Sequence, residues 1–272
     1  MFAEVKDYFR INKLPHLWCP GCGNGIATSC LVKSIKACNY NHDDIVVVSG
    51  IGCSSRITGY LNFDTLHTTH GRALPFATGI KMAKPNLKVF VVSGDGDASA
   101  IGGNHFIHSA RRNIDMTLMI INNNIYGMTG GQYSPMTPTG SKATTSPYGN
   151  IDRNFDLAKL AVGAGATYVA RATTYHTNLL TRLLTKASKH KGFAVVEVVS
   201  ACPVSFGRKN KMGTPAAMLK WQKEHAVTVA RAKTMDEQAL KDKFVIGELH
   251  HSVAAEYTEA YRFLVESLRE DR

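Results

Sequence analysis

Short apolar runs recur along the first two hundred residues and predict the strands of a buried sheet. They are rich in Val, Ile and Leu and span residues 44–49, 88–93, 115–121, 168–170 and 193–199. Unbroken apolar runs of this length are typical of parallel strands that are covered on both faces. Segments with helical spacing separate them, at residues 24–37, 98–113, 154–162 and 177–190, and a further helix follows the 68–75 loop and runs to about residue 82. The alternation predicts an α/β fold with a mostly parallel sheet and helices on both faces.

The end of the chain follows a different pattern. Residues 214–272 contain every glutamate except Glu4 and Glu197. An apolar stripe at helical spacing runs through Val253, Tyr257, Tyr261, Leu264, Val265 and Leu268. We therefore expect residues 1–213 to form one α/β domain and residues 214–272 to form a mainly helical extension. This extension is expected to wrap the domain or a partner subunit.

Polar glycine turns follow two of the predicted strands. The first turn is GDGD at residues 94–97, and the second is NNNIYG at residues 122–127. A right-handed crossover between parallel strands brings their carboxyl ends side by side, so we expect Asp95 and Asn123 to meet at the edge where α/β proteins bind ligands. One carboxylate and one amide oxygen suit Mg²⁺, which keeps other positions for phosphate and water. The N-terminus of the helix after the first turn favours the phosphate.

This order of turns resembles the binding signature for thiamine diphosphate (TPP), in which GDG is followed by Asn-Asn after a helix and a strand. The dinucleotide fingerprint GxGxxG is not matched, because residues 94–99 lack the third glycine. An ordinary βαβ unit with a polar rim is the alternative. The combination of both strands, the helix and both turns at this spacing favours TPP.

One absence bears on this prediction. Between Glu4 and Glu197 the sequence contains no glutamate. TPP enzymes use a glutamate that is hydrogen-bonded to the aminopyrimidine ring, and it favours the tautomer that deprotonates the thiazolium carbon. We therefore expect another polypeptide to hold the pyrimidine half of the cofactor.

Four cysteines lie in turns and are candidates for metal ligands. Cys19 and Cys22 belong to the turn WCPGCG, while Cys53 and Cys202 each follow a predicted strand. By itself the CxxC spacing is compatible with zinc, an iron–sulfur cluster or a redox disulfide. No strand precedes it, which disfavours a thioredoxin-like site. Four cysteines suit either a cluster or structural zinc, whereas the remaining two, Cys30 and Cys38, are expected to be ordinary buried residues.

Two side chains in a polar loop are candidates for substrate contacts. His70 and Arg72 flank Gly71 in the loop 68–75, which enters a helix that is predicted to run to about residue 82. A single histidine or arginine is more often structural or solvated. Together, at this place in the fold, the two side chains become candidates for binding an anionic substrate. The arginine suits a carboxylate because its guanidinium can bind both oxygens.

The composition narrows the class of protein. The formal net charge is +11, which favours acidic partners or ligands. No nucleic-acid-binding motif is present and the basic residues are spread along the chain, so phosphate-bearing cofactors or an acidic redox protein explain the charge equally well. No apolar run approaches a membrane span, and the N-terminus lacks a signal-peptide core. We expect a cytoplasmic protein whose cysteines serve metal or redox chemistry.

Several of these motifs occur together in one known family. WCPGCG, GIGCSS, HGR and GDGD followed by NNNIYG, with a late Cys-Pro before FGRKNK, resemble the β subunit of the 2-oxoacid:ferredoxin oxidoreductases. The resemblance covers roughly residues 8–213. The features YGMTGGQ and GRKNKM are most like the bacterial 2-oxoglutarate type (2-oxoglutarate synthase).

The resemblance implies ligands and contacts for each cofactor. Cys19, Cys22, Cys53 and Cys202 look like ligands of one [4Fe–4S] cluster, whereas Asp95, Asn123 and the carbonyl of Ile125 would hold Mg²⁺. The implied TPP contacts are Ile51, Gly52, Cys53, Ser54, His70, Gly71, Arg72, Gly96, Asp97, Gly127 and Met128.

The family also implies an activity and partners. TPP, Mg²⁺ and the cluster would support oxidative decarboxylation of a 2-oxoacid with coenzyme A (CoA), and the electrons would pass to ferredoxin. An α subunit would complete the cofactor site and contribute most CoA contacts. We expect the substrate to be 2-oxoglutarate, with Arg72 or a partner residue meeting its distal carboxylate. The alternatives are pyruvate or a branched-chain 2-oxoacid, a non-redox TPP decarboxylase or synthase, and a non-enzymatic iron–sulfur or zinc protein.

Overall fold

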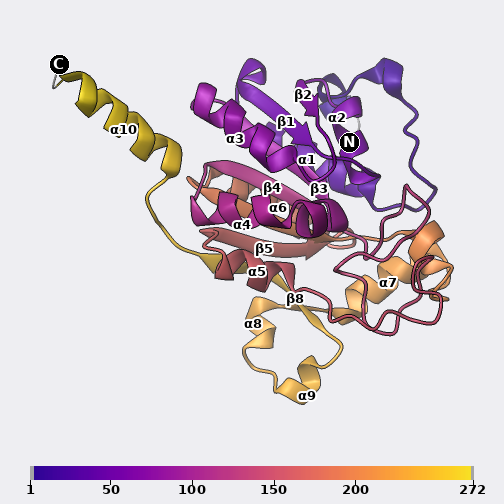
Figure 1. Ribbon diagram of the computed structural model, residues 1–272. Coiled ribbons are helices and arrows are strands. Elements are labelled where there is room, and N and C mark those ends of the chain that lie inside the picture. Colours follow the sequence, from indigo (N-terminus) through magenta and orange to yellow (C-terminus); the bar gives the residue numbers. More distant parts are fainter. Residues whose placement is uncertain (1–2, 271–272) are drawn as a thin grey trace.

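The computed structural model describes residues 3–270, which are built around one eight-stranded sheet (Figure 1). The order across the sheet is β2-β1-β3-β4-β6-β5-β8-β7. Neighbouring strands are parallel except for β5 and β8, which pair antiparallel. The strands are β1 Ile45–Ser49, β2 Asp64–His67, β3 Lys88–Gly94, β4 Met116–Asn122, β5 Tyr168–Thr173, β6 Phe193–Val199, β7 Ala226–Thr228 and β8 Phe244–His251. The predicted α/β fold with a mostly parallel sheet is confirmed.

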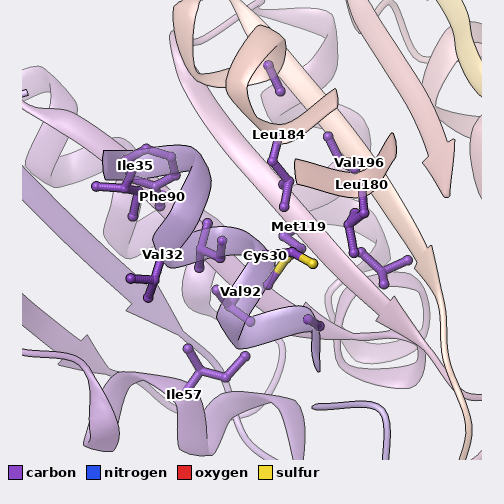
Figure 2. Close-up of a cluster of buried hydrophobic side chains, with 14 of the residues drawn as sticks. Cys30, Val32, Ile35, Ile57, Phe90, Val92, Met119, Leu180, Leu184 and Val196 are labelled. Atoms are coloured by element: carbon purple, nitrogen blue, oxygen red, sulfur yellow. The ribbon is translucent and has the colours of Figure 1, made fainter. Parts of the chain in front are cut away.

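Two hydrophobic cores lie on opposite faces of this sheet, because alternate side chains of each strand point to opposite sides. One core packs α1 and α6 against one face, and Figure 2 shows Cys30 and Ile35 of α1 near Val92, Met119 and other strand residues of this core. The other core packs α3, α4 and α5 against the opposite face. These helices are α1 Asn24–Cys38, α3 Ala73–Ala83, α4 Gly103–Arg111, α5 Leu157–Gly163 and α6 Thr177–Lys189.

The helix predicted at residues 98–113 is interrupted. A π-helical turn, Asp97–Ile101, comes first, and α4 begins after Gly102. A Cβ atom on Gly102 would lie 2.3 Å from the backbone oxygen of Asp97, so only glycine allows this close approach. The helix predicted at residues 154–162 also starts later than expected, because the Asp156 side chain caps it by accepting hydrogen bonds from two amides.

The C-terminal segment adds strands as well as helices. The expectation of a mainly helical extension missed β7 and β8, which lie at the edge of the sheet beyond β5. Strand β8 has only three leading apolar residues, then Gly247, and a register irregularity opposite residues 169 and 170. Strand β2 was also missed, because its residues are mostly polar and it lies at the other edge. The helices of this segment are α7 Pro215–His225, α8 Val229–Ala232, α9 Glu237–Leu240 and α10 Tyr257–Glu270.

The C-terminal helix α10 projects away from the body of the molecule (Figure 1). Its apolar stripe therefore does not pack on this domain: Tyr261, Leu264 and Leu268 are each about half exposed. Val253 lies before the helix begins and is 91% exposed, so it is not part of the helical stripe. Contact of the stripe with a partner subunit remains a prediction.

Buried Glu256 anchors the base of α10. Its carboxylate accepts hydrogen bonds from the Thr258 hydroxyl (2.6 Å) and from the amides of Asp115, Thr258 and Glu259. Burial opposes ionisation of Glu256, but these hydrogen bonds outweigh it and hold its pKa below the usual value. A depressed folded-state pKa means that the carboxylate stabilises the anchor at neutral pH, and that this stabilisation is lost as the pH falls through the folded-state pKa.

Replacing Glu256 by alanine is expected to loosen α10 without unfolding the sheet. Loss of hydrogen bonds to a buried charged cap costs about 1–2 kcal/mol, so the amides of α10 should exchange about 5–30 times faster at pH 7. Hydrogen exchange followed by mass spectrometry measures this. Glu266→Ala is the matched control, because Glu266 lies on the same helix in an exposed pair with Arg262 and should change exchange about two-fold at most. Equal effects of both variants would contradict the anchoring role.

Candidate active site

The turns after β1, β3 and β4 line one cavity. These three strands are neighbours in parallel register, so their carboxyl ends lie at the same edge of the sheet. The cavity is lined by residues 51–54, 94–97 and 125–129 together with His70, Ile121 and Asn123. The structure therefore gathers the residues expected to bind TPP and Mg²⁺, apart from Gly71 and Arg72, which lie beside the cavity without lining it.

Asp95 is a buried carboxylate without a basic partner. It is 2% exposed, and it accepts hydrogen bonds from the Ser134 hydroxyl and from backbone amides that include that of Asn123. Burial, only partly offset by these hydrogen bonds, raises the pKa of Asp95 to about 7. Among residues 3–270 no Lys, Arg or His forms an ion pair with it. A buried carboxylate beside an amide side chain and a ligand cavity fits a hard cation such as Mg²⁺.

The second turn is fixed by its own asparagine side chains. The side-chain Oδ1 of Asn122 accepts from the Asn124 backbone amide (3.2 Å), and the side-chain Oδ1 of Asn123 accepts from the Ile125 backbone amide (3.3 Å). Asn124 has a φ of 63°, a left-handed conformation that asparagine tolerates better than most residues. Asn123 and Ile125 thereby line the cavity next to Asp95.

Asp97 organises the surrounding loops. Its carboxylate accepts hydrogen bonds from the Ser93 hydroxyl (2.5 Å), the Gly71 amide (2.7 Å), the Ile51 amide (3.3 Å) and the His70 ring. The residue lines the first cavity, where its contact with TPP stays a prediction, and these four donors engage both of its carboxylate oxygens. Asp97 thus joins the ends of β1 and β3 to the loop before α3, and this second role could not be read from the sequence.

His70 faces the cavity, whereas Arg72 does not. The Nδ1 atom of His70 is hydrogen-bonded to Asp97, and the ring stands edge-on to Tyr126 at 5.8 Å between centroids. The Arg72 guanidinium donates to the carbonyl oxygen of Ile101 (3.2 Å) and is not among the residues that line the cavity. The geometry therefore favours His70 over Arg72 as a group that meets the reacting atoms from this chain.

Tyr126 and Ser134 were not singled out from the sequence. The Tyr126 hydroxyl donates to the Gly96 carbonyl (3.0 Å), and a Cβ atom on Gly96 would lie 2.2 Å from the tyrosine ring. Glycine at position 96 is thus required for the ring to cover the turn. Ser134, which contacts Asp95, belongs to the long loop 128–150, and the length of that loop was the available signal of a functional segment.

The four candidate cysteines line a second cavity of about 270 Å³. They come from three separate parts of the chain, the 19–22 turn, the turn after β1 and the segment after β6. A Cβ atom on Gly127 would lie 3.5 Å from the sulfur of Cys53 and 3.5 Å from that of Cys202, so these two sulfurs lie within twice that distance of each other. The structure therefore brings together the cysteines expected to act as ligands.

Burial makes negative charge unfavourable in this second cavity. It raises the pKa of Cys22 to about 12 and that of Cys53 to about 11, and the neighbouring cysteines add to both shifts. Thiolates gathered here need a compensating positive charge, which a metal centre supplies. Within the described part of the chain, no group of three or more Cys, His, Asp or Glu is arranged to hold a metal ion. Cys30 and Cys38 do not line this cavity: Cys30 is buried in a hydrophobic core, and the Cys38 sulfur contacts the Ser188 hydroxyl.

The two cavities adjoin. Cys53, Asn123, Gly127 and Met128 line both of them. No glutamate lines the first cavity in the region that the structure describes. Glu197 is committed elsewhere, because its carboxylate accepts from Arg171 (2.7 Å) and Asn122 (2.8 Å). The described part of this chain thus supplies no glutamate to the first cavity.

Comparison with known proteins identifies the family. Residues 50–198 match the family described as thiamine pyrophosphate enzyme, C-terminal TPP binding domain. The chain is 54% identical to the 2-oxoglutarate synthase subunit KorB of Methanocaldococcus jannaschii over 264 residues, which cover 97% of this chain and 98% of the relative. The chain belongs to the KorB family. It is also 57% identical to KorB of Archaeoglobus fulgidus, over 83% of this chain and 82% of the relative.

A solved structure agrees with this KorB assignment. A chain of the 2-oxoglutarate:ferredoxin oxidoreductase from Magnetococcus marinus, with 2-oxoglutarate, CoA and succinyl-CoA bound, superposes with a TM-score of 0.86. The two chains are 32% identical, and the match covers 97% of this chain and 90% of the other. The predicted resemblance to a ferredoxin-dependent oxidoreductase β subunit is confirmed. This KorB chain is therefore a subunit of a multi-subunit oxidoreductase with a TPP-binding domain.

None of the helices within residues 3–270 combines the length and the apolar character that crossing a membrane requires.

Proposed function

We propose that this KorB chain is the TPP- and [4Fe–4S]-binding subunit of a cytoplasmic 2-oxoglutarate:ferredoxin oxidoreductase. The complete enzyme converts 2-oxoglutarate and CoA into succinyl-CoA and carbon dioxide, passes two electrons to ferredoxin, and runs in either direction. The observation that carries this proposal is the shared wall of the two cavities, formed by Cys53, Asn123, Gly127 and Met128. An electron donor and an electron acceptor bound in adjoining cavities suit transfer over a short distance.

The first cavity supplies the groups that Mg²⁺ and TPP need. Asp95, the Asn123 side chain and the Ile125 carbonyl would hold the metal ion, and residues 51–54, 70, 96, 97, 127 and 128, which line the cavity, would contact TPP. Gly71 and Arg72 lie beside the cavity and would reach TPP only at its margin. Bound TPP supplies a carbanion and an electron sink for decarboxylation. Tyr126 covers the first glycine turn through its hydrogen bond to the Gly96 carbonyl. A bound cation would compensate the negative charge of Asp95, which burial makes unfavourable.

His70 is the best candidate from this chain for handling the substrate oxygen. The hydrogen bond between its Nδ1 atom and Asp97 fixes the ring, so the Nε2 atom is left to face the cavity. From there Nε2 would exchange a hydrogen bond or a proton with the keto oxygen during the reaction. Arg72 stays a candidate for the distal carboxylate of 2-oxoglutarate if its guanidinium leaves the Ile101 carbonyl when substrate binds.

The second cavity suits a cluster better than a single ion. Zinc draws its four sulfur ligands to about 2.3 Å from one centre, whereas a [4Fe–4S] cluster holds them further apart. Cys19, Cys22, Cys53 and Cys202 are among the residues that line a cavity of about 270 Å³, which offers more room than a single ion needs. The cluster would take electrons one at a time and make the oxidative reaction possible. A non-redox TPP decarboxylase would have no use for this second cavity.

A partner chain is required to complete the first cavity. The described part of this chain offers no glutamate there, because Glu197 is buried in its pair with Arg171. An α subunit would supply the pyrimidine-binding glutamate and most contacts to CoA.

Anaerobic purification of the chain together with its partner tests the proposal. We expect about four irons, about four sulfides and one TPP for each copy of this chain. Turnover with a viologen dye as acceptor should depend on CoA and be faster with 2-oxoglutarate than with pyruvate or branched 2-oxoacids. Colourless protein containing zinc would refute the cluster, CoA-independent decarboxylation would favour a non-redox enzyme, and faster turnover of pyruvate would refute the substrate.

A further inference from the structure

The cysteine cavity opens onto a surface with an apolar rim. Leu17 is 75% exposed, Met128 48% and Val204 37%, and all three line that cavity together with the exposed residue Cys19. A single exposed apolar side chain is common, but three that line one cavity form a group of the kind that a partner covers.

The segments that build this surface contain no acidic residue. Asp and Glu are absent from residues 8–42, 45–63, 116–151 and 198–223, which carry the four cysteines and the Gly127 turn. The last of these segments alone carries five Lys and Arg, and three of them, Arg208, Lys209 and Lys211, are exposed on one loop. On these segments the charged side chains are therefore all basic, which favours an acidic partner.

The positive side chains lie close to the cavity and carry uncompensated charge. Exposed Arg56 lines the cavity itself. Lys209 lies next to Ser205, another lining residue: a Cβ atom on Gly131 would be 3.5 Å from the Lys209 Cε and 3.3 Å from the Ser205 Cβ. Within residues 3–270 neither Arg56 nor Lys209 pairs with a carboxylate. The same surface on a second copy would carry like charge, whereas an acidic partner complements it.

We propose that this surface, Leu17, Arg56, Met128, Val204 and the 208–211 loop, is where a small acidic iron–sulfur protein of the ferredoxin class docks. The inference rests on the proposed function, since it needs a cluster behind the four cysteines. The positive loop steers the acidic protein and orients it, and the apolar rim excludes water around Cys19, the exposed one of the four cysteines.

Charge reversal on the loop tests the docking surface in the complete complex. Lys209→Glu, alone and with Lys211→Glu, should raise the KM for ferredoxin about five- to ten-fold at low salt, and the difference from wild type should shrink as salt screens the charges. Turnover with methyl viologen should stay at the wild-type rate, because a small dye does not need the docking surface. Lys84→Glu is the matched control. Exposed Lys84 follows α3 and precedes β3, so it lies near the amino ends of the strands, away from the carboxyl ends that line the cavities. Turnover with ferredoxin and turnover with methyl viologen should both stay unchanged in this variant.

The outcomes separate the docking surface from the proposed reaction. A ferredoxin KM in Lys209→Glu equal to that of Lys84→Glu would overturn the docking surface and leave the viologen reaction standing. Dissociation of the complex in Lys209→Glu would also overturn it, because the surface would then be a contact between subunits. Wild-type complex that fails to reduce viologen with 2-oxoglutarate and CoA would overturn the reaction, and the docking surface with it.

Discussion

Replacing Cys53 by alanine is expected to remove the iron–sulfur cluster while TPP stays bound. Cys53 is one of four sulfurs around the second cavity, and a cluster that loses a ligand is no longer held by the set that [4Fe–4S] centres require. Iron should fall from about four to less than about one per chain, the brown colour should disappear, and viologen-linked turnover should fall at least about 100-fold. Metal analysis and visible absorbance of anaerobic protein measure the first two changes.

The matched control for this variant is Cys38→Ala. Cys38 is half-buried at the end of α1, where its sulfur lies 3.0 Å from the Ser188 hydroxyl and outside both cavities. Iron content and turnover should match wild type. A Cys53→Ala protein that kept four irons would show that the sulfur is not a ligand. Loss of TPP along with the iron would show instead that the alanine disturbed the whole turn after β1.

Replacing Asp95 by asparagine is expected to weaken cofactor binding and, at the same time, to stabilise the cofactor-free complex. Asparagine has nearly the same shape but no charge, so binding of Mg²⁺ and TPP should weaken at least about 100-fold. The cofactor-free complex should become more stable, because the buried carboxylate has a pKa raised to about 7 and its charge is unfavourable without a cation. Calorimetric titration of TPP and a thermal scan of the cofactor-free complex measure the two effects.

The gain in stability should depend on pH in a defined direction. The pKa of Asp95 in the folded state is raised from the ordinary value of 3.8 to about 7. The free-energy cost of ionising the buried carboxyl is therefore absent below pH 3.8, grows between pH 3.8 and about pH 7, and is complete above about pH 7. At pH 8 the variant should gain about 1–3 kcal/mol, or about 2–6 °C in apparent melting temperature, and less at pH 5. Exposed Asp64 is the control, since Asp64→Asn should change neither property. Wild-type TPP affinity in Asp95→Asn would refute the magnesium site.

Local sequence patterns were sufficient for the five central strands, the turns and the family. The buried strands β1, β3, β4 and β6 are unbroken Val- and Ile-rich runs, and burial on both faces is what selects such runs. Strands β2 and β8 escaped prediction because they lie near the edges of the sheet, where partial exposure allows polar residues and removes the pattern. Sequence spacing also identified Asp95 and Asn123, because a βαβ unit fixes where its two strand ends meet.

Contacts between distant segments were decided by the tertiary structure alone. Cys53 and Cys202 flank Gly127 only because the order of the strands sets β1, β4 and β6 close together, and no local pattern records that order. The same holds for Ser134 on Asp95, and for the way Asp97 joins three loops. The sequence by itself determined which reactive side chains the protein contains and which strand ends they follow. Folding decided which of those groups share a cavity, because long-range packing, rather than spacing along the chain, sets distances between side chains.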